Sequence, residues 1–190
     1  METSQRVWNA AHLAIEWHGL DCRKGRIGGY TLLYVSHTMS VMKRAYVVGA
    51  GTDLIMCGCL GHDLLEDTKI TWDLIRNALG EDIANLIKEL TFVSGTMTKE
   101  EYLKTFEKSS VPALLIKVLD RIDNIWDFLS TDPQYAVKYF HKADVLWGIW
   151  EKRSAEIDEY FLRLLHAEPK GTVRSRVSDM ICDMENAVFP

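Results

Sequence analysis

Two histidines and two aspartates interrupt segments of this chain that are otherwise apolar: His37, His62, Asp63 and Asp120. Imidazole and carboxylate groups are ligands for octahedral divalent metals, and four of them leave positions open for water and substrate. Asp120 is especially informative, because an unpaired charge in so apolar a stretch would cost several kcal/mol. The pattern indicates a hydrolase that depends on a divalent metal ion.

Two more acidic residues, Glu66 and Asp67, follow His62-Asp63 in the same short segment. Residues three and four positions further along a helix return to the same face, so both carboxylates are expected near the ion without being its ligands. A carboxylate at that place can take or orient a proton of the water that the metal activates. The spacing therefore favours a role in water activation.

Each of these residues also has a structural explanation. A histidine on an apolar helix is more often a hydrogen-bonded core residue than a ligand. Glu66 can be a solvated surface charge, and Asp67 can simply stand at a helix end. Lys117 or Arg121 can supply the partner that a buried Asp120 needs. The spacing alone leaves these alternatives open.

The elements that must position these residues are expected to be helices almost throughout, because apolar residues recur at spacings of three and four. Thr52 and Thr71 are suitable helix caps, Pro112 suits a first turn, and Gly80 suits a helix end. Helices are predicted over residues 6–17, 31–48, 53–64, 72–80, 81–92, 99–108, 112–128, 135–150, 155–167 and 172–187.

Two segments need separate arguments. The apolar run over residues 113–119 suits a buried strand as well as a helix, but no second strand candidate exists to pair with it, which favours a helix. Residues 22–29 are polar, basic and contain glycine, which predicts a loop. The expected fold class is all-α, a helical bundle.

Length and composition favour one domain over residues 1–190, since the chain is 47% hydrophobic with only 4 Pro and 12 Gly. The motifs fall within residues 10–150, and the helices over 155–187 are expected to pack on that core. A formal charge of −5 provides no broad basic field. This charge argues against duplex nucleic acid as a partner.

The sequence shows no sign of export or of a membrane span. Its first residues lack a basic n-region and an apolar h-region, and no apolar run approaches the roughly 20 residues that cross a bilayer. The four cysteines lack CxxC spacing, so reduced thiols in a cytoplasmic protein are expected, with Cys57 and Cys59 in the core. Oligomeric state is not predicted.

The order of the motifs resembles the HD-type hydrolase domain of the Rel/Spo family and, in size, the single-domain small alarmone hydrolases. The resemblance spans residues 10–128 and continues more weakly to residue 150. Its most specific parts are the strings at residues 62–68 (HDLLEDT) and 117–124 (KVLDRIDN). Supporting strings are Arg23-Lys24, Tyr34-Val35-Ser36-His37, Gly80-Glu81-Asp82-Ile83 and Glu89-Leu90-Thr91.

The resemblance implies an HD-domain bundle and a manganese-dependent enzyme that removes the 3′-pyrophosphate of guanosine tetra- and pentaphosphate. Glu66 and Asp67 would activate or place the attacking water. Arg23, Lys24 and Asn124 would contact the nucleotide, an arginine being able to stack on a base or to bind phosphate through paired hydrogen bonds. The metal ligands would be the four residues of the opening motif: His37, His62, Asp63 and Asp120.

A highly anionic substrate also requires cations around the acidic site. Arg23 and Lys24 are favoured for this role because they stand shortly before His37. The lysines at positions 99, 104 and 108 are more simply explained as solvated surface charges, and the same holds for residues 141 and 142.

Four positions depart from the family pattern. Thr38 stands where a proline is common, and Leu119 where a small residue is common. Asp123 replaces an aromatic residue or a histidine, and Phe92 replaces a frequent lysine. The metal ligands survive these changes, so the motifs support the reaction type more directly than the substrate.

Two other functions remain compatible with the sequence. An HD-type phosphohydrolase acting on deoxynucleotides, nucleoside monophosphates or NADPH would share the His-Asp-x-x-Glu core, and only Asp67, Asn124 and the flanking strings favour the alarmone. A non-catalytic nucleotide-binding regulator is the other, although the presence of all the ligands and both acidic residues argues against it. The ligands themselves accept Mn, Fe, Co or Zn.

Overall fold

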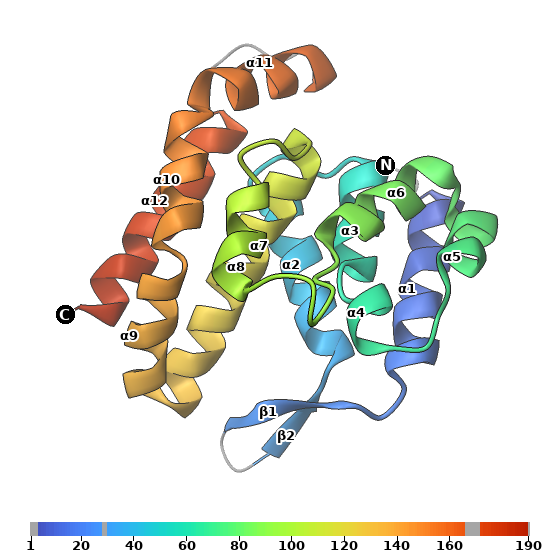
Figure 1. Cartoon of the computed structure of the whole chain (residues 1–190), viewed down its shortest axis with the longest axis horizontal. Helices are drawn as coiled ribbons and strands as arrows, with labels where there is room; N and C mark the ends of the chain where they lie inside the picture. Colours follow the sequence, from blue (N-terminus) through green and yellow to red (C-terminus); the bar gives the residue numbers. More distant parts are fainter. Residues whose placement is uncertain (1–3, 28–29, 166–171, 190) are drawn as a thin grey trace.

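The computed structural model describes residues 4–27, 30–165 and 172–189. Within these ranges the chain is almost entirely helical, with one two-stranded sheet, so the predicted fold class is confirmed (Figure 1). The elements in chain order are α1 (Gln5–His18), β1 (Cys22–Ile27), β2 (Tyr30–Leu33), α2 (Val35–Val47), α3 (Asp53–Gly61), α4 (Leu64–Asp67), α5 (Trp72–Leu79), α6 (Glu81–Leu90), α7 (Lys99–Thr105), α8 (Val111–Thr131), α9 (Pro133–Lys142), α10 (Asp144–Lys152), α11 (Ser154–Leu165) and α12 (Val173–Val188).

Short polar residues begin many of these helices. Thr52 and Thr71 accept hydrogen bonds from the backbone amides three residues later, as expected for N-caps. Thr98 and Glu101 form a reciprocal capping box at the start of α7. Gly80 adopts a φ of 98°, which lets the chain leave α5 and enter α6 directly.

The segment before the second helix was predicted wrongly. Residues 22–29 were expected to be a loop and residue 31 to begin a helix, but β1 and β2 form an antiparallel hairpin and α2 starts at Val35. The sequence Tyr-Thr-Leu-Leu of β2 has the aromatic and β-branched character of a strand. The basic run before β2 forms the partner strand β1, whose polar composition had suggested a loop.

Two predicted helices are divided. The helix expected over residues 53–64 ends at Gly61, and His62 and Asp63 form the junction between α3 and α4. The helix expected over 135–150 consists of α9 and α10, which meet at Ala143. The first division matters for function, because a junction lets two adjacent side chains point toward the same place.

Helix α3 lies between two groups of buried apolar side chains and contributes to both. Ile55 and Cys59 pack with residues of α2 and α8, whereas Cys57 and Leu60 pack with residues of α1, α5 and α6. A helix that is apolar on all sides is typical of such a central position. The predicted core placement of Cys57 and Cys59 is therefore confirmed, since neither is exposed.

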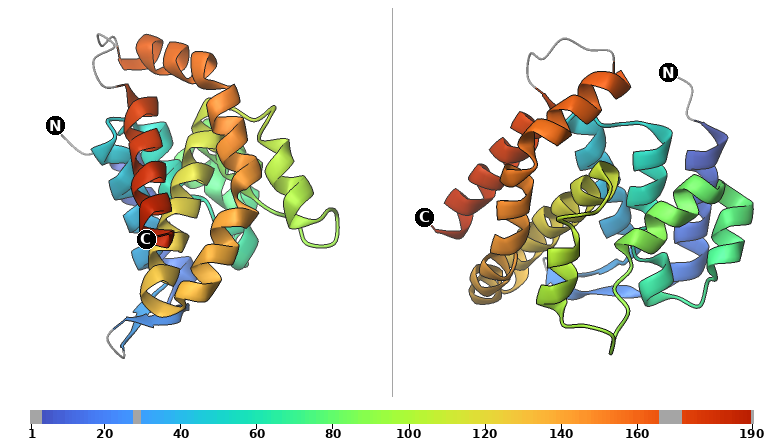
Figure 2. Two further views of the ribbon diagram at one scale, coloured as in Figure 1. Left: turned by 90° about the vertical axis from the view of Figure 1, so that its left-hand side faces the viewer. Right: turned by 45° about the horizontal axis from the view of Figure 1, so that its top comes forward.

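Helix α8 is the axis of the larger group. Every residue from Val111 to Asp120 is buried, and α2, α3, α6, α9, α10 and α12 all contact this helix. Figures 1 and 2 show α9, α10 and α12 on one side of α8, with α2 and α3 on the other. The apolar run at residues 113–119 is thus helical, as preferred. No helix within the described ranges is long and apolar enough to span a bilayer.

Gly58 allows α3 to approach its neighbours closely, because an added Cβ would lie 2.6 Å from Ile116 Cδ1 and 2.8 Å from Leu86 Cδ2. We predict that Gly58→Ala lowers the free energy of unfolding by about 1–3 kcal/mol, measured by urea denaturation. Gly148→Ala is the matched control in α10, where no described atom lies within 4 Å of the new Cβ. Gly148→Ala should raise the free energy of unfolding by about 0.5–1 kcal/mol. Equal stability of Gly58→Ala and the parent chain would contradict the close packing.

Candidate metal centre

The structure brings the four predicted metal ligands together from separate elements. His37 lies in the first turn of α2, His62 and Asp63 at the α3–α4 junction, and Asp120 in the middle of α8. All four are buried. His37 Nε2 is 3.1 Å from Asp120 Oδ1 and 3.8 Å from Asp63 Oδ2. His62 Nε2 is 2.8 Å from Asp63 Oδ2 and 3.7 Å from Asp120 Oδ1.

Both imidazole rings are oriented by their other nitrogen. His62 Nδ1 lies 2.7 Å from the carbonyl oxygen of Cys59, which can only accept, so Nδ1 carries a proton. His37 Nδ1 lies 2.8 Å from Asp123 Oδ2 and donates in the same way. In the neutral rings each Nε2 therefore presents a lone pair to the aspartates, and the buried Nε2 of His62 has no aligned hydrogen-bond partner. This is the usual arrangement of metal-binding histidines.

The charges around the cluster do not balance without a further cation. Three carboxylates are buried here, those of Asp63, Asp120 and Asp123. Lys117 Nζ lies 3.0 Å from Asp120 Oδ2, and Arg44 Nε lies 3.0 Å from Asp123 Oδ1. With neutral imidazoles, one negative charge remains uncompensated. A divalent cation would change the net charge of the cluster from negative to positive and create a site that attracts anions.

The histidine pKa values reflect the same imbalance. Burial lowers the pKa of His62, but the carboxylates of Asp63 and Asp120 outweigh burial and raise this pKa to about 10. Burial likewise opposes charge on His37, and hydrogen bonds to Asp120 and Asp123 raise its pKa. The surroundings thus favour positive charge at the two rings. The donor set fits a divalent metal ion, which would occupy that place.

Asp120 serves two of the roles considered from the sequence. Its Oδ2 is paired with Lys117, so the structural explanation holds for that oxygen. Its Oδ1 faces both histidines and also accepts a hydrogen bond from Asn124 Nδ2. Arg121 does not pair with it but lies with its guanidinium 4.8 Å from the centre of the Tyr139 ring. One oxygen of Asp120 is therefore anchored while the other is directed into the cluster.

The two acidic residues predicted for water activation stand on α4, immediately after the junction that carries the ligands. Glu66 and Asp67 are both exposed to solvent. Glu66 Oε2 accepts a hydrogen bond of 3.1 Å from the backbone amide of Phe92, which limits where its carboxylate can lie. The surrounding protein displaces water from the Glu66 carboxyl group and so raises its pKa. The positive charge of Lys117 opposes this effect. A raised pKa brings a carboxyl group closer to the range in which it exchanges protons near neutral pH.

Two predicted substrate-binding residues are linked to each other and to the cluster. Arg23 of β1 donates to Asn124 Oδ1 at 2.8 Å and forms an ion pair of 3.0 Å with Asp127. Asn124 in turn donates to Asp120 at 2.5 Å. The hairpin is thereby fastened to α8 beside the candidate metal site. The side chain of the third predicted residue, Lys24, lies outside the described part of the structure.

The sequence did not predict the roles that several further residues have at the centre. Tyr34 donates a hydrogen bond of 2.6 Å to Asp63 Oδ2, and the ring of His18 stacks on Tyr34 with 4.7 Å between centroids. Asp123 contacts His37, Ser40 and Arg44. A signal was present, because residues 37, 40 and 44 fall on one helix face and residue 123 follows Asp120 by three. These positions became visible only once the facing helices were paired.

A cavity of about 730 Å³ lies beside α8. Burial raises the pKa of Tyr139 in its wall to about 12; Arg121 opposes this effect, and Asp120 adds to it. The wall also includes Arg121, the residue that directly follows Asp120 in α8. Residues 99, 141 and 142, which the sequence placed on the surface by default, belong to its lining: Lys99, Glu100, Leu103, Arg121, Tyr135, Tyr139, His141, Lys142, Asp144 and Val145.

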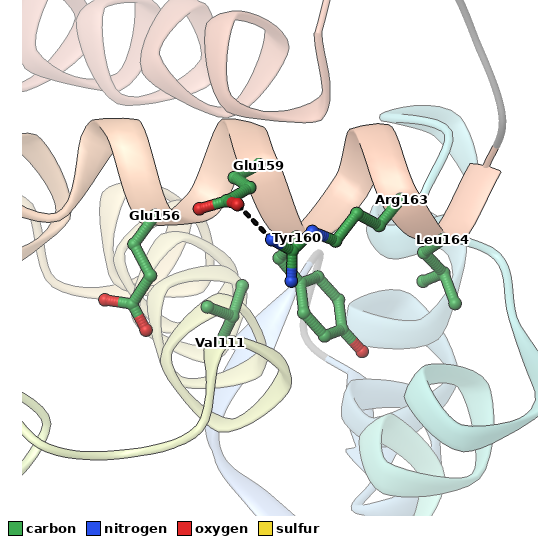
Figure 3. A pocket seen from close by; sticks show the side chains of 6 residues that line it. All are labelled: Val111, Glu156, Glu159, Tyr160, Arg163 and Leu164. Atoms are coloured by element: carbon green, nitrogen blue, oxygen red, sulfur yellow. Dashed lines mark hydrogen bonds and ion pairs between the residues drawn. The ribbon is translucent and has the colours of Figure 1, made fainter.

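A second cavity of about 440 Å³ lies beneath α11 and is bordered by Val111 (Figure 3). Tyr160 and Leu164 supply apolar surface to it, while Glu159 and Arg163 form an ion pair along the helix. None of the predicted site residues lines either cavity. The first is the better candidate for a substrate pocket because Arg121, which directly follows Asp120 in α8, belongs to its wall.

Curated relatives of this chain are found, although no protein-family model matches it. A guanosine-3′,5′-bis(diphosphate) 3′-pyrophosphohydrolase of Aquifex aeolicus is 26% identical over 196 residues, covering 96% of this chain and 27% of the relative. A protein of the same enzymatic name from Drosophila melanogaster is 28% identical over 141 residues, covering 67% of this chain and 79% of the relative. Its counterpart in Xenopus tropicalis is 28% identical over 134 residues, covering 67% of this chain and 72% of the relative.

The fold has a solved counterpart in a metazoan ortholog of SpoT, described as hydrolysing ppGpp and acting in starvation responses. The two chains share 21% sequence identity and a TM-score of 0.74, with 96% of this chain and 97% of that chain covered. By contrast, this chain spans only 27% of the length of the Aquifex aeolicus relative. The resemblance predicted from the motifs is confirmed by the relatives, and the HD-type helical fold by the structural match.

We predict that Asp120→Asn strongly reduces bound metal, because the substitution removes the anionic oxygen that faces both histidines while keeping the side-chain shape. The measurement is the metal content of the protein, determined by mass spectrometry after loading with Mn²⁺ and desalting. Circular dichroism must show that the variant is folded, since Lys117 loses its partner. Asp132→Asn is the control, because asparagine can also cap α9. A folded Asp120→Asn variant with full metal content would show that Asp120 is not a ligand.

Proposed function

We propose that this chain, which is similar to Rel/Spo-type HD hydrolases in sequence and fold, removes the 3′-pyrophosphate of guanosine tetra- and pentaphosphate with a bound divalent metal, Mn²⁺. The observation that carries the proposal is the buried cluster of His37, His62, Asp63 and Asp120, whose rings are oriented for a cation and whose charge is unbalanced without one. The enzymatic names of the relatives support the substrate, and the family resemblance supports the choice of manganese.

The acidic residues of α4 supply the proton chemistry of the proposed reaction. When bound, the metal lowers the pKa of water and polarises phosphate oxygens. Glu66, restrained by the amide of Phe92, accepts a proton from the attacking water, and Asp67 orients that water. The water oxygen forms a bond to the phosphorus attached to the 3′ oxygen, and the bond between that phosphorus and the 3′ oxygen breaks. The 3′ oxygen takes up a proton from solvent, and Glu66 releases to solvent the proton that it accepted. The products are pyrophosphate with GDP or GTP.

The cavity beside α8 provides groups that suit a phosphorylated nucleotide. Lys99, Arg121 and Lys142 bring cations to it from three helices. Arg121 is half-buried, with its guanidinium beside the Tyr139 ring, and its buried Nε has no hydrogen-bond partner among the described residues. Arginine guanidinium groups bind phosphate oxygens through paired hydrogen bonds, and tyrosine rings offer a surface for a base. These features support the cavity as the place of the substrate.

A less highly charged nucleotide is the second candidate substrate. Glu100 and Asp144 also line the cavity and reduce its positive charge. Phe92 stands where the family commonly has a lysine, so one positive charge is lost at that position. Lys99 brings a positive charge nearby, with its Nζ 5.9 Å from the centre of the Phe92 ring. An HD-type phosphohydrolase of deoxynucleotides, nucleoside monophosphates or NADPH would use the same metal centre.

The test of the proposed function is turnover by purified protein that has been stripped of metal and reloaded with Mn²⁺. We predict that ppGpp yields GDP and pyrophosphate, separated by anion-exchange chromatography. The comparison substrates are dATP, dGTP, a nucleoside monophosphate and NADPH. Hydrolysis of one of these with no action on ppGpp would assign the pocket to another nucleotide. Inactivity on all of them, in protein shown to contain the metal, would favour a binding function.

We predict that Glu66→Gln lowers kcat by about 10²- to 10⁴-fold, because the amide cannot accept the proton of the attacking water. Metal content should stay unchanged, since Glu66 is not a ligand, and the glutamine oxygen can still accept the Phe92 amide. Glu107→Gln is the control: it alters an exposed carboxylate paired with Lys152 on the surface and should keep full activity. A fully active Glu66→Gln enzyme would remove Glu66 from the mechanism.

A further inference from the structure

The carboxylate of Asp123 is buried between α2 and α8, and both of its oxygens are engaged by side chains of α2. Oδ2 lies 2.8 Å from His37 Nδ1. Oδ1 accepts hydrogen bonds from Ser40 Oγ and from Arg44 Nε, the latter at 3.0 Å. Every group that contacts this carboxylate is therefore a donor, which is the environment of an ionised aspartate.

Helix spacing explains why these contacts form together. On α2, residues three and seven positions after His37 return to its face, which places Ser40 and Arg44 beside it. On α8, Asp123 is one turn beyond Asp120. The His37 ring consequently lies between two carboxylates, with Nδ1 toward Asp123 and Nε2 toward Asp120.

We infer that Asp123 is a positioning residue for the metal centre: it holds the Nδ1 proton of His37 and so directs the Nε2 lone pair at the cation. Ser40 and Arg44 hold Asp123 in place. The inference rests on the proposed metal site. It goes beyond the family resemblance, because the family usually has an aromatic residue or a histidine at this position, and neither side chain provides a carboxylate.

The side-chain type at position 123 decides which tautomer of His37 is stable. An ionised carboxylate only accepts hydrogen bonds, so Nδ1 must carry the proton. An asparagine amide can either accept or donate, and by donating to Nδ1 it would stabilise the tautomer protonated at Nε2. That tautomer cannot bind a metal through Nε2. Asp123→Asn therefore removes the tautomer control with little change in side-chain size.

A purely structural role for Asp123 has a different consequence. If the Asp123–Arg44 contact only joins α2 to α8, its loss would lower the stability of the chain and leave the intrinsic metal affinity of the folded protein unchanged. If Asp123 orients His37, its loss weakens the metal affinity of protein that is still folded. Removing partners that orient metal-binding histidines typically costs about 10- to 100-fold in affinity.

The experiment is titration of Mn²⁺ into metal-free protein, with the free ion measured by electron paramagnetic resonance and no nucleotide present. We expect Asp123→Asn to bind Mn²⁺ about 10- to 100-fold more weakly than the parent chain. Asp158→Asn is the matched control, because it removes a carboxylate from a comparable contact between helices, 2.8 Å from Arg174 Nε, and should leave the affinity unchanged. Folded Asp123→Asn protein with parental affinity would overturn the inference.

A second variant covers the case in which Asp123→Asn does not fold. Ser40→Ala keeps the carboxylate and removes one of its anchors, and should weaken Mn²⁺ binding about fivefold, as expected for one lost hydrogen bond. Unchanged affinity of Ser40→Ala in that case would overturn the inference. The binding measurement is independent of substrate, so weakened affinity supports Asp123 even if ppGpp is not hydrolysed. Conversely, ppGpp turnover with unchanged affinity in these variants would leave the proposed function standing and reject the role of Asp123.

Discussion

The mutual repulsion of three buried carboxylates is the constraint on which this structure depends. Asp63, Asp120 and Asp123 lie within a tightly packed interior, where like charges repel strongly and isolated ions are poorly tolerated. Lys117 and Arg44 compensate part of this charge. The remaining need for positive charge is focused between the two histidines, and a divalent metal would meet it. The acidic cluster thus has the charge and geometry of the proposed cation site.

The fold holds this cluster by bringing rigid elements together at one point. Helix α8 presents Asp120 and Asp123 from a segment packed on nearly all sides, and α2 presents His37 opposite them. The break between α3 and α4 places His62 and Asp63 in the same space and starts the short helix that carries Glu66 and Asp67. Apolar packing around α3 and α8 therefore fixes the distances on which the proposed chemistry depends.

The helical fold class and the gathering of the four proposed ligands could be predicted from the sequence, because periodicity, caps and motif spacing are local signals. The hairpin was missed because the basic composition of β1 resembles a loop and its pairing with β2 is a contact between segments. The roles of Asp123 and Tyr34 were not predicted for a related reason: each depends on a contact with a segment far away in the sequence. Lys99 and His141 likewise line one cavity only because residues of α7, α8 and α9 come together there, which no single segment encodes.

The most direct test of the central claim is a crystal structure of the protein soaked in Mn²⁺, with anomalous diffraction recorded at the manganese absorption edge. The account predicts one strong anomalous peak within bonding distance of His37 Nε2, His62 Nε2 and the carboxylates of Asp63 and Asp120. A peak at another place, or none in this cluster at saturating Mn²⁺, would contradict the claim that these buried charges are arranged to hold a divalent metal.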